Sequence, residues 1–315
     1  MKLKRQFVGT IQPSAPFNFD ATFHKPAHFP SGDNFWKPGV RWQTFRWGRE
    51  NLGVIFRNAG TVTKPKIAVE IFGKGKLSNS FVDDFIKEII YRYNLNLDLT
   101  EFYKEFSEDK VLGPVIKRIS GMRPGHQNSL YEYLIIGIIL QNCTVRRSIQ
   151  MMQTLFENYG VLLEYHGRKL WCFWEPRSLK NVTEDKLRSL KLGYRAKFIK
   201  KIDDQFAKGE INEAKLKTQS MEEQKQKLLK LYGVGPATVW YLLFDVFHQL
   251  DFFHYISPWE QKIYSKIFSV PKNKLIIYFD RFGKHKQLAV HYVWEDLWWE
   301  HKKKPIEWLA KEIRT

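Results

Sequence analysis

The chain has 315 residues, 43% of them hydrophobic and 16% aromatic, so it can bury a sizeable core and is not a disordered polypeptide. It carries 51 Lys and Arg against 33 Asp and Glu, a formal net charge of +18, which favours a polyanionic partner, with nucleic acid first. Its two cysteines, Cys143 and Cys172, are too few for a disulfide framework, an iron–sulfur cluster or a four-thiolate zinc site.

The number of cysteines and the length of the apolar runs indicate in which cellular compartment the protein works. The two cysteines fit a reduced intracellular compartment. The first residues, MKLKRQFVGT, lack the apolar core of a secretory signal, and the apolar run over residues 133–140 is too short to span a bilayer. We therefore expect an intracellular protein that works where nucleic acid is found and has no membrane partner.

The first hundred residues are typical of a β-rich segment. APFNFDATFHKPAHF alternates aromatic and polar residues, and RWQTFRW and NLGVIFRNAG are short strand-like runs. Gly, Asn and Pro separate these runs, and KPKIAVEIFGKGKL adds a strand that ends in a glycine-containing turn. The pattern predicts an antiparallel sheet with one face in water.

From Ser80 onwards the hydrophobic period becomes that of helices. NSLYEYLIIGIIL predicts a central apolar helix, and VRRSIQMMQTLFENYG an amphipathic helix that stops at Gly160. In SPWEQKIYSKIF, Ser257 and Glu260 predict a capping box with Pro258 in the first turn. The sequence thus predicts an α+β chain, with a β-rich N-terminal domain over residues 1–105 and an all-α domain over residues 106–315.

A tight glycine turn joins two predicted helices in LYGVGPATVWYLLFDVF, residues 231–247. Gly233 and Gly235 permit backbone angles that a side chain would forbid, and they let a surface approach the backbone closely. Because the second helix begins near Pro236, its free N–H groups can bind phosphate without any side chain. Such contacts position a protein on DNA without reading its sequence. The structural alternative is an ordinary helix–helix corner with a glycine cap.

Four segments, in order, resemble the HhH-GPD superfamily of DNA glycosylases, in its 8-oxoguanine and alkyladenine branch. LYGVGPAT is similar to the helix-hairpin-helix of that family, and LKLGYRAKFI, residues 190–199, to the stretch upstream of it. GMRPGHQNSLYEYLIIGIILQNCTVRRSIQMMQTLFENYG resembles the opening of the helical domain, and FGKHKQLAVHYVWEDLW its last core helix. The β-rich start fits the N-terminal sheet domain of the same branch.

The resemblance implies an all-α helix-hairpin-helix glycosylase domain that extrudes a damaged base from duplex DNA and excises it. Extrusion costs a few kcal/mol, which cationic groups on the flanking phosphates offset. Gln141 or its neighbour Asn142 stands where the family places the wedge that fills the gap, with a helix cap as the alternative for Gln141. The implied DNA contacts also include Gly233, Val234, Gly235, Ala237, Arg195 and Lys262.

Two tryptophans are candidates for the wall of a base pocket. Trp294 falls where the family's last helix often carries a stacking aromatic residue, and Trp259 is the second candidate. Packing in the core is the alternative for both, since that is the commoner fate of tryptophan. The resemblance also implies a monovalent cation held by the hairpin carbonyls. No histidine spacing points to another metal.

The residues on which the family's chemistry depends are replaced. A carboxylate beside the sugar can stabilise the cation that forms when the glycosidic bond breaks. Ser257 falls on the aspartate of the family pattern, and Ala237 on the lysine that forms a Schiff base in bifunctional members. Val290 replaces a glutamine that many 8-oxoguanine enzymes place on the base edge. We therefore expect neither lyase chemistry through that lysine nor 8-oxoguanine specificity.

Three interpretations of the missing aspartate stay open. Glu260 or Asp251 could act as the surrogate carboxylate, although capping and loop roles explain these two as well. The enzyme could instead act without a carboxylate on an alkylated purine, whose positive charge makes it a good leaving group. In the third interpretation the chain is a non-catalytic protein that binds lesions or abasic sites. The sequence favours a monomeric, monofunctional DNA glycosylase for alkylated purines.

Overall fold

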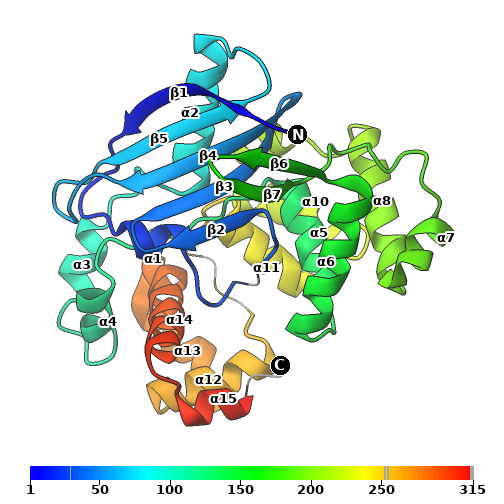
Figure 1. The fold of residues 1–315 in the computed structure, drawn as a ribbon. Coiled ribbons are helices and arrows are strands. Elements are labelled where there is room, and N and C mark those ends of the chain that lie inside the picture. Colours follow the sequence, from blue (N-terminus) through cyan, green and yellow to red (C-terminus); the bar gives the residue numbers. More distant parts are fainter. Residues whose placement is uncertain (29, 252, 254, 313–315) are drawn as a thin grey trace.

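The computed structural model describes residues 1–28, 30–251, 253 and 255–312. An antiparallel sheet of five strands lies at the N-terminal end of the chain, and most of the remaining chain is helical (Figure 1). The sheet has the strand order β1-β5-β4-β3-β2. Its strands are β1 (Lys4–Ile11), β2 (Asn34–Lys37), β3 (Val40–Trp47), β4 (Glu50–Asn58) and β5 (Ile67–Gly73). The predicted α+β fold class is therefore confirmed.

Alternation along the strands sends apolar side chains to both faces of the sheet. One face packs on helix α2 (Asn79–Arg92), where Val54 and Val69 contact the cluster that contains Phe85. On the other face, Ile55 is covered by the hairpin of β6 (Val161–Tyr165) and β7 (Arg168–Cys172). Towards β1 this second face is open, and Val8 is 61% exposed. The prediction of one wet face thus holds only for that edge of the sheet.

The β6–β7 hairpin also corrects the prediction of an all-α segment from residue 106 onwards. Its strands are short, and they are stable because they cover the sheet with Leu163 and Leu170. The other elements of this region are α3 (Thr100–Phe106), α4 (Leu112–Arg118), α5 (Leu130–Leu140), α6 (Val145–Tyr159), α7 (Glu184–Leu187), the π-turn η1 (Arg188–Leu192), α8 (Arg195–Ala207), α9 (Glu213–Lys217), α10 (Met221–Leu229), α11 (Pro236–Asp245), α12 (Pro258–Phe268), the 3₁₀ turns η2 (Lys272–Lys274) and η3 (Asp280–His285), α13 (Leu275–Phe279), α14 (Lys286–Lys303) and α15 (Glu307–Glu312). A short helix, α1 (Phe19–Phe23), precedes β2.

Local signals in the sequence set several helix ends. Helix α6 ends at Tyr159 with Gly160 as its C-cap, as predicted. Helix α12 begins with Pro258 after a complete capping box of Ser257 and Glu260, also as predicted. Helix α5 is buried along nearly its whole length and belongs to the main helical core, as its apolar sequence indicates.

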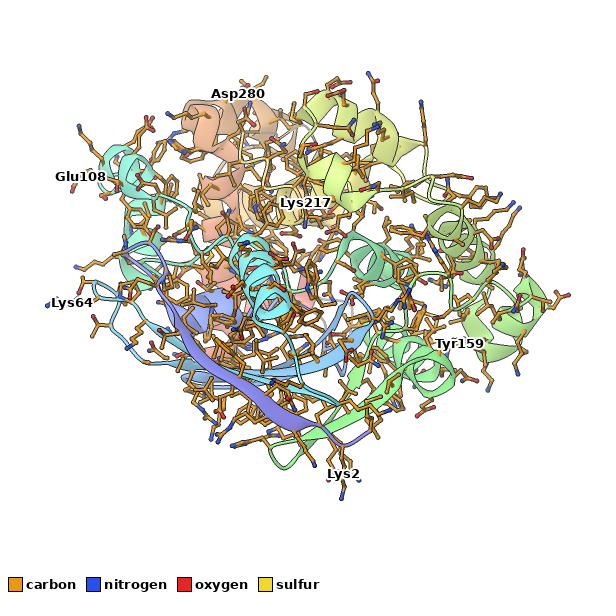
Figure 2. All side chains as sticks on the ribbon, turned by 90° about the horizontal axis from the view of Figure 1, so that it is seen from above. Lys2, Lys64, Glu108, Tyr159, Lys217 and Asp280 are labelled. Atoms are coloured by element: carbon orange, nitrogen blue, oxygen red, sulfur yellow. The ribbon has the colours of Figure 1, made fainter. Side chains whose placement is uncertain are left out.

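Helix α11 lies between two groups of helices (Figure 1). It contacts α10 and α5 on one side of the molecule, and α12 to α15 form the group at the C-terminal end. Side chains project around the whole outline of the molecule in Figure 2, with Lys2 near the sheet and Asp280 on the far side of the helical region. Helix α11, which follows the hairpin, therefore lies where the two groups of helices meet.

Candidate functional site

The turn between α10 and α11 uses its two glycines differently. Gly233 has φ +81°, and a Cβ on it would lie 2.7 Å from Cδ2 of Phe198. Gly235 has φ −100° and would carry a Cβ with no atom within 4 Å. The fold therefore requires glycine at position 233, while glycine at 235 leaves an open backbone surface beside the start of α11.

The first amide groups of α11 have no partner within the helix. Val239 N–H donates to Gly235 O at 3.0 Å and makes the first turn of helical hydrogen bonding. The N–H groups of Ala237 and Thr238 come before Val239 in the helix and have no helical acceptor. Pro236 has no N–H, and the N-cap residue Gly235 has no side chain that could accept a hydrogen bond. These free N–H groups, together with the positive end of the helix dipole, form a site suited to an anion such as phosphate.

Gln141 connects the end of α5 to the hairpin. Its Nε2 donates to Gly233 O at 2.9 Å, and its own carbonyl accepts a hydrogen bond from the Arg195 guanidinium. Gln141, Arg195 and Gly233, all predicted to belong to one site, are therefore brought together. The side chain of Gln141 is engaged, whereas the neighbouring Asn142 is exposed, has φ +46°, and makes no side-chain hydrogen bond to any residue that the structure describes.

Two exposed tyrosines beside the hairpin were not predicted from the sequence. Tyr194 is 42% exposed and Tyr232 is 38% exposed, and both rings contact Phe198 with centroids 5.4 Å apart. Lys197 Nζ lies 5.4 Å from the centre of the Tyr232 ring. Aromatic rings beside a cation suit a nucleic-acid surface. The stretches GYRA and LYGVG could have predicted these two tyrosines as part of the site, because each stretch places a tyrosine next to a glycine turn.

Ser257 and Glu260 hold the start of α12. Ser257 Oγ accepts the Glu260 N–H at 3.2 Å, and Glu260 Oε2 accepts the Ser257 N–H at 3.1 Å. Glu260 Oε1 accepts a hydrogen bond from the Tyr241 hydroxyl at 2.8 Å, so this carboxylate bridges α11 and α12. Asp251 is exposed and has no hydrogen bond or ion pair within the described ranges. Of the two predicted carboxylates, only Glu260 is held in a fixed orientation.

The two tryptophans proposed for a base pocket contact each other edge to face, with ring centroids 5.4 Å apart. Trp294 also contacts Tyr264 at 5.7 Å, and both tryptophans are partly buried. Trp259 Nε1 donates to the main-chain oxygen of Glu312 at 2.7 Å, and Lys262 Nζ lies 3.5 Å from Glu312 Oε2. Lys262, predicted as a DNA contact, therefore pairs with the C-terminal helix. Val290, at the position of the expected glutamine, is buried.

A buried group of ionisable residues lies where α11 and α14 approach the segment after α1, and no motif in the sequence predicts it. Glu295 and Lys25 are buried, and the Glu295 carboxylate is 4.0 Å from Nε2 of His28. Burial raises the pKa of Glu295 to about 7, although the Lys25 charge opposes this. Burial likewise raises the pKa of Asp245 to about 6, against the effect of the hydrogen bond that Tyr133 donates to it. Burial lowers the pKa of His28 to about 3.

The residues that the structure describes include no group of three or more His, Cys, Asp or Glu arranged to hold a metal ion. Within the same residues, no helix is both long and apolar enough to cross a membrane. The predicted monovalent cation would need carbonyl oxygens of the hairpin. Those of Leu231 and Gly233 accept hydrogen bonds from Val234 N–H and Gln141 Nε2, which leaves each a lone pair for an ion. The cation stays a prediction.

Curated relatives match part of the chain, and no protein-family model matches it. DNA-3-methyladenine glycosylase of Bacillus subtilis is 26% identical over 162 residues, which make up 51% of this chain and 54% of that protein. The "Probable N-glycosylase/DNA lyase" of Methanothermobacter thermautotrophicus is 25% identical over 200 residues, 58% of this chain and 63% of that protein. The chain therefore spans less than two thirds of the length of either relative.

Solved structures match almost the whole chain. The 3-methyladenine DNA glycosylase from Archaeoglobus fulgidus gives a TM-score of 0.75 at 17% identity and covers 95% of this chain and 99% of its own. The 8-oxoguanine glycosylase/lyase from Clostridium acetobutylicum, in complex with double-stranded DNA, gives a TM-score of 0.65 at 20% identity and covers 96% and 99%. This chain therefore has the HhH-GPD glycosylase fold, in the form that includes an N-terminal sheet.

Proposed function

We propose that this protein is a monofunctional DNA glycosylase of base excision repair, which extrudes a damaged purine from duplex DNA and excises it. Alkylated purines are the proposed substrate class. The observation that carries the proposal is the open hairpin at Gly235, with its free amide groups, in a chain of net charge +18 that has the glycosylase fold. We also propose that the protein is a monomer and that it is located in the same compartment as the DNA.

In the proposed complex, the hairpin amides bind a phosphate near the lesion while basic side chains neutralise its neighbours. Asn142 is the better candidate for the wedge, because Gln141 is engaged by Gly233 O. The extruded base would stack on an aromatic face, for which Trp294 is the candidate. Each of these roles supports extrusion, and none of them reads the sequence around the lesion.

Glu260 is the proposed carboxylate for the chemical step. It is held by Tyr241 and by the Ser257 amide, so its negative charge is fixed at the joint between α11 and α12. A preoriented charge of this kind stabilises the oxocarbenium-like sugar as the base departs. An alkylated purine is already cationic and needs less help to leave. Ala237 supplies no amine, so strand cleavage through a Schiff base at that position is not part of the proposal.

The second candidate function is a protein that binds lesions or abasic sites without excising a base. The observation that favours it is the pair of replacements, with Ser257 acting as a helix cap and Ala237 in the hairpin. In this alternative, the phosphate-binding surface is retained although the chemistry is absent.

Incubation with lesion duplexes separates the two candidates. Duplexes that carry an alkylated purine, 8-oxoguanine, uracil or an abasic site are incubated with the protein and treated with hot alkali, and released base is measured directly. Release of an alkylated purine, with strand breaks only after alkali and no adduct trapped by borohydride, supports the monofunctional glycosylase. Tight binding that weakens with salt, with no base released from any duplex, refutes it and supports the binding protein.

A further inference from the structure

The loop that joins α5 to α6 carries the proposed wedge, and it is tied to the rest of the fold at both ends. At its start, the Gln141 side chain donates to Gly233 O at 2.9 Å. At its end, Thr144 O accepts a hydrogen bond from the Ser148 hydroxyl at 3.2 Å. This wedge loop, residues 141–144, is therefore a short segment with anchored ends, and the direction of its side chains depends on how its peptide groups are held.

Arg195 on α8 holds the first peptide group of the wedge loop. Its guanidinium donates to Gln141 O, and the Tyr194 hydroxyl donates to the same oxygen at 3.4 Å. Gln141 O and the Asn142 N–H belong to one planar peptide unit, so fixing the oxygen fixes the direction in which the chain enters Asn142. Asn142 has φ +46°, a left-handed conformation that few residues other than glycine adopt. Arg195 therefore acts on Asn142 through the main chain.

The Arg195 side chain is committed to the protein. The residue is 8% exposed, and its buried Nε has no hydrogen-bond partner among the described residues. In that part of the chain no carboxylate pairs with the guanidinium, whose Cζ lies 4.7 Å from the centre of the Tyr194 ring. Burying a cation without an acidic partner is costly, so the hydrogen bond to Gln141 O and the contact with the ring are what compensate it. A contact with a DNA phosphate would require the side chain to leave both.

We propose that Arg195 is a positioning residue, which holds the peptide between Gln141 and Asn142 so that the Asn142 side chain can fill the space of the extruded base. This inference rests on the proposed function, because it concerns the extrusion step, and it replaces the DNA contact that the family resemblance implies for Arg195. The two roles differ in their consequences. A phosphate contact adds to the affinity for every duplex and to its salt dependence, whereas a positioning residue acts only when a base leaves the stack.

The test measures extrusion and binding separately, and neither measurement depends on catalysis. Extrusion is followed by the fluorescence of 2-aminopurine at the target position of a duplex that is saturated with full-length protein. Binding is followed by anisotropy with an undamaged duplex at several salt concentrations. We expect Arg195→Met to lower the extruded fraction about tenfold, as for the loss of one hydrogen bond from a charged donor, and to bind the undamaged duplex as wild type does. Arg195→Lys keeps a donor for Gln141 O and should recover most of the extrusion.

A double-mutant cycle distinguishes positioning from a general loss of structure. In the Asn142→Ala background, Arg195→Met should change extrusion less than about twofold, because the side chain that Arg195 positions is then absent. The matched control is Lys201→Met, which removes an exposed cation of the same helix and should behave as wild type in both assays. Circular dichroism reports the fold. If Arg195→Met is not folded, Arg195→Gln takes its place, since its side chain is too short to reach Gln141 O.

Weaker binding of folded Arg195→Met to the undamaged duplex, with a salt dependence reduced by the slope of about 0.9 that one phosphate contributes, would overturn the inference. Equal extrusion by wild type and Arg195→Met would also overturn it, as would additive losses in the double variant or no extrusion by wild type. A failure of the proposed function has a different signature, because no base would be released from any lesion duplex. A binding protein without catalysis would still show the coupling between Arg195 and Asn142.

Discussion

Substituting the two hairpin glycines separately distinguishes a role in the fold from a role in DNA binding. In Gly233→Ala the new side chain meets two obstacles. The backbone stays at φ +81°, which costs a non-glycine residue about 1–3 kcal/mol. The Cβ would also lie 2.7 Å from Phe198 Cδ2 and 2.8 Å from its Cγ, and relieving this overpacking costs about 1–3 kcal/mol more.

The total for Gly233→Ala is about 2–6 kcal/mol. With about 2.1 cal/mol/K of unfolding entropy per residue, a 315-residue chain should lose about 3–9 °C in thermal midpoint. Gly235→Ala places its Cβ in open space on extended backbone, so it should cost less than about 1 kcal/mol, the difference between glycine and alanine at an N-cap. That same Cβ stands where a phosphate would approach the amides. We therefore expect DNA affinity to fall about 10- to 100-fold, the loss of one charge-assisted hydrogen bond.

Urea unfolding followed by tryptophan fluorescence measures the first effect, and fluorescence anisotropy with intact and lesion-bearing duplexes measures the second. Gly235→Ala should weaken binding to all duplexes alike, because phosphate contacts carry no sequence information. Wild-type stability in Gly233→Ala would refute the reasoning about the fold. A loss of affinity confined to one lesion in Gly235→Ala would refute the phosphate role.

Three further predictions concern Glu260, the pair Gln141 and Asn142, and the buried Asp245. Glu260→Gln can keep the capping box, and it should lower the excision rate at least about 100-fold without changing the affinity for an abasic duplex. The control Asp251→Asn should leave both the rate and the affinity unchanged. Equal excision rates of wild type and Glu260→Gln in single-turnover assays would remove Glu260 from the mechanism. Asn142→Ala should reduce base extrusion, measured by 2-aminopurine fluorescence, more than Gln141→Ala does, and the reverse order would make Gln141 the wedge. Because burial raises the pKa of Asp245 to about 6, its folded form holds a proton that the unfolded chain releases, so stability should fall by about 3 kcal/mol between about pH 4 and 6. Urea unfolding of Asp245→Asn should lack this decline, and an unchanged pH profile would contradict it.

Local features of the sequence were sufficient for the elements that local chemistry controls. The capping box of Ser257 and Glu260, the stop at Gly160 and the turn at Gly233 each depend on backbone geometry within a few residues, and each is where the sequence predicted it. The α+β class followed from the change of hydrophobic period near Ser80, because strands and helices bury different spacings of apolar residues.

The tertiary structure alone decided which distant groups meet. The β6–β7 hairpin is stable because it covers an otherwise open face of the sheet. The local sequence of the hairpin does not predict that it packs on this face. Gln141 was predicted from its place after α5, but only the fold shows its amide bound to Gly233 O. In the local sequence, Glu295 is one acidic residue of a predicted amphipathic helix. It becomes a buried carboxyl, without a hydrogen-bond partner among the described residues, because α14 packs against α11 and against the segment after α1. The convergence of remote segments is not encoded in the spacing of any one of them.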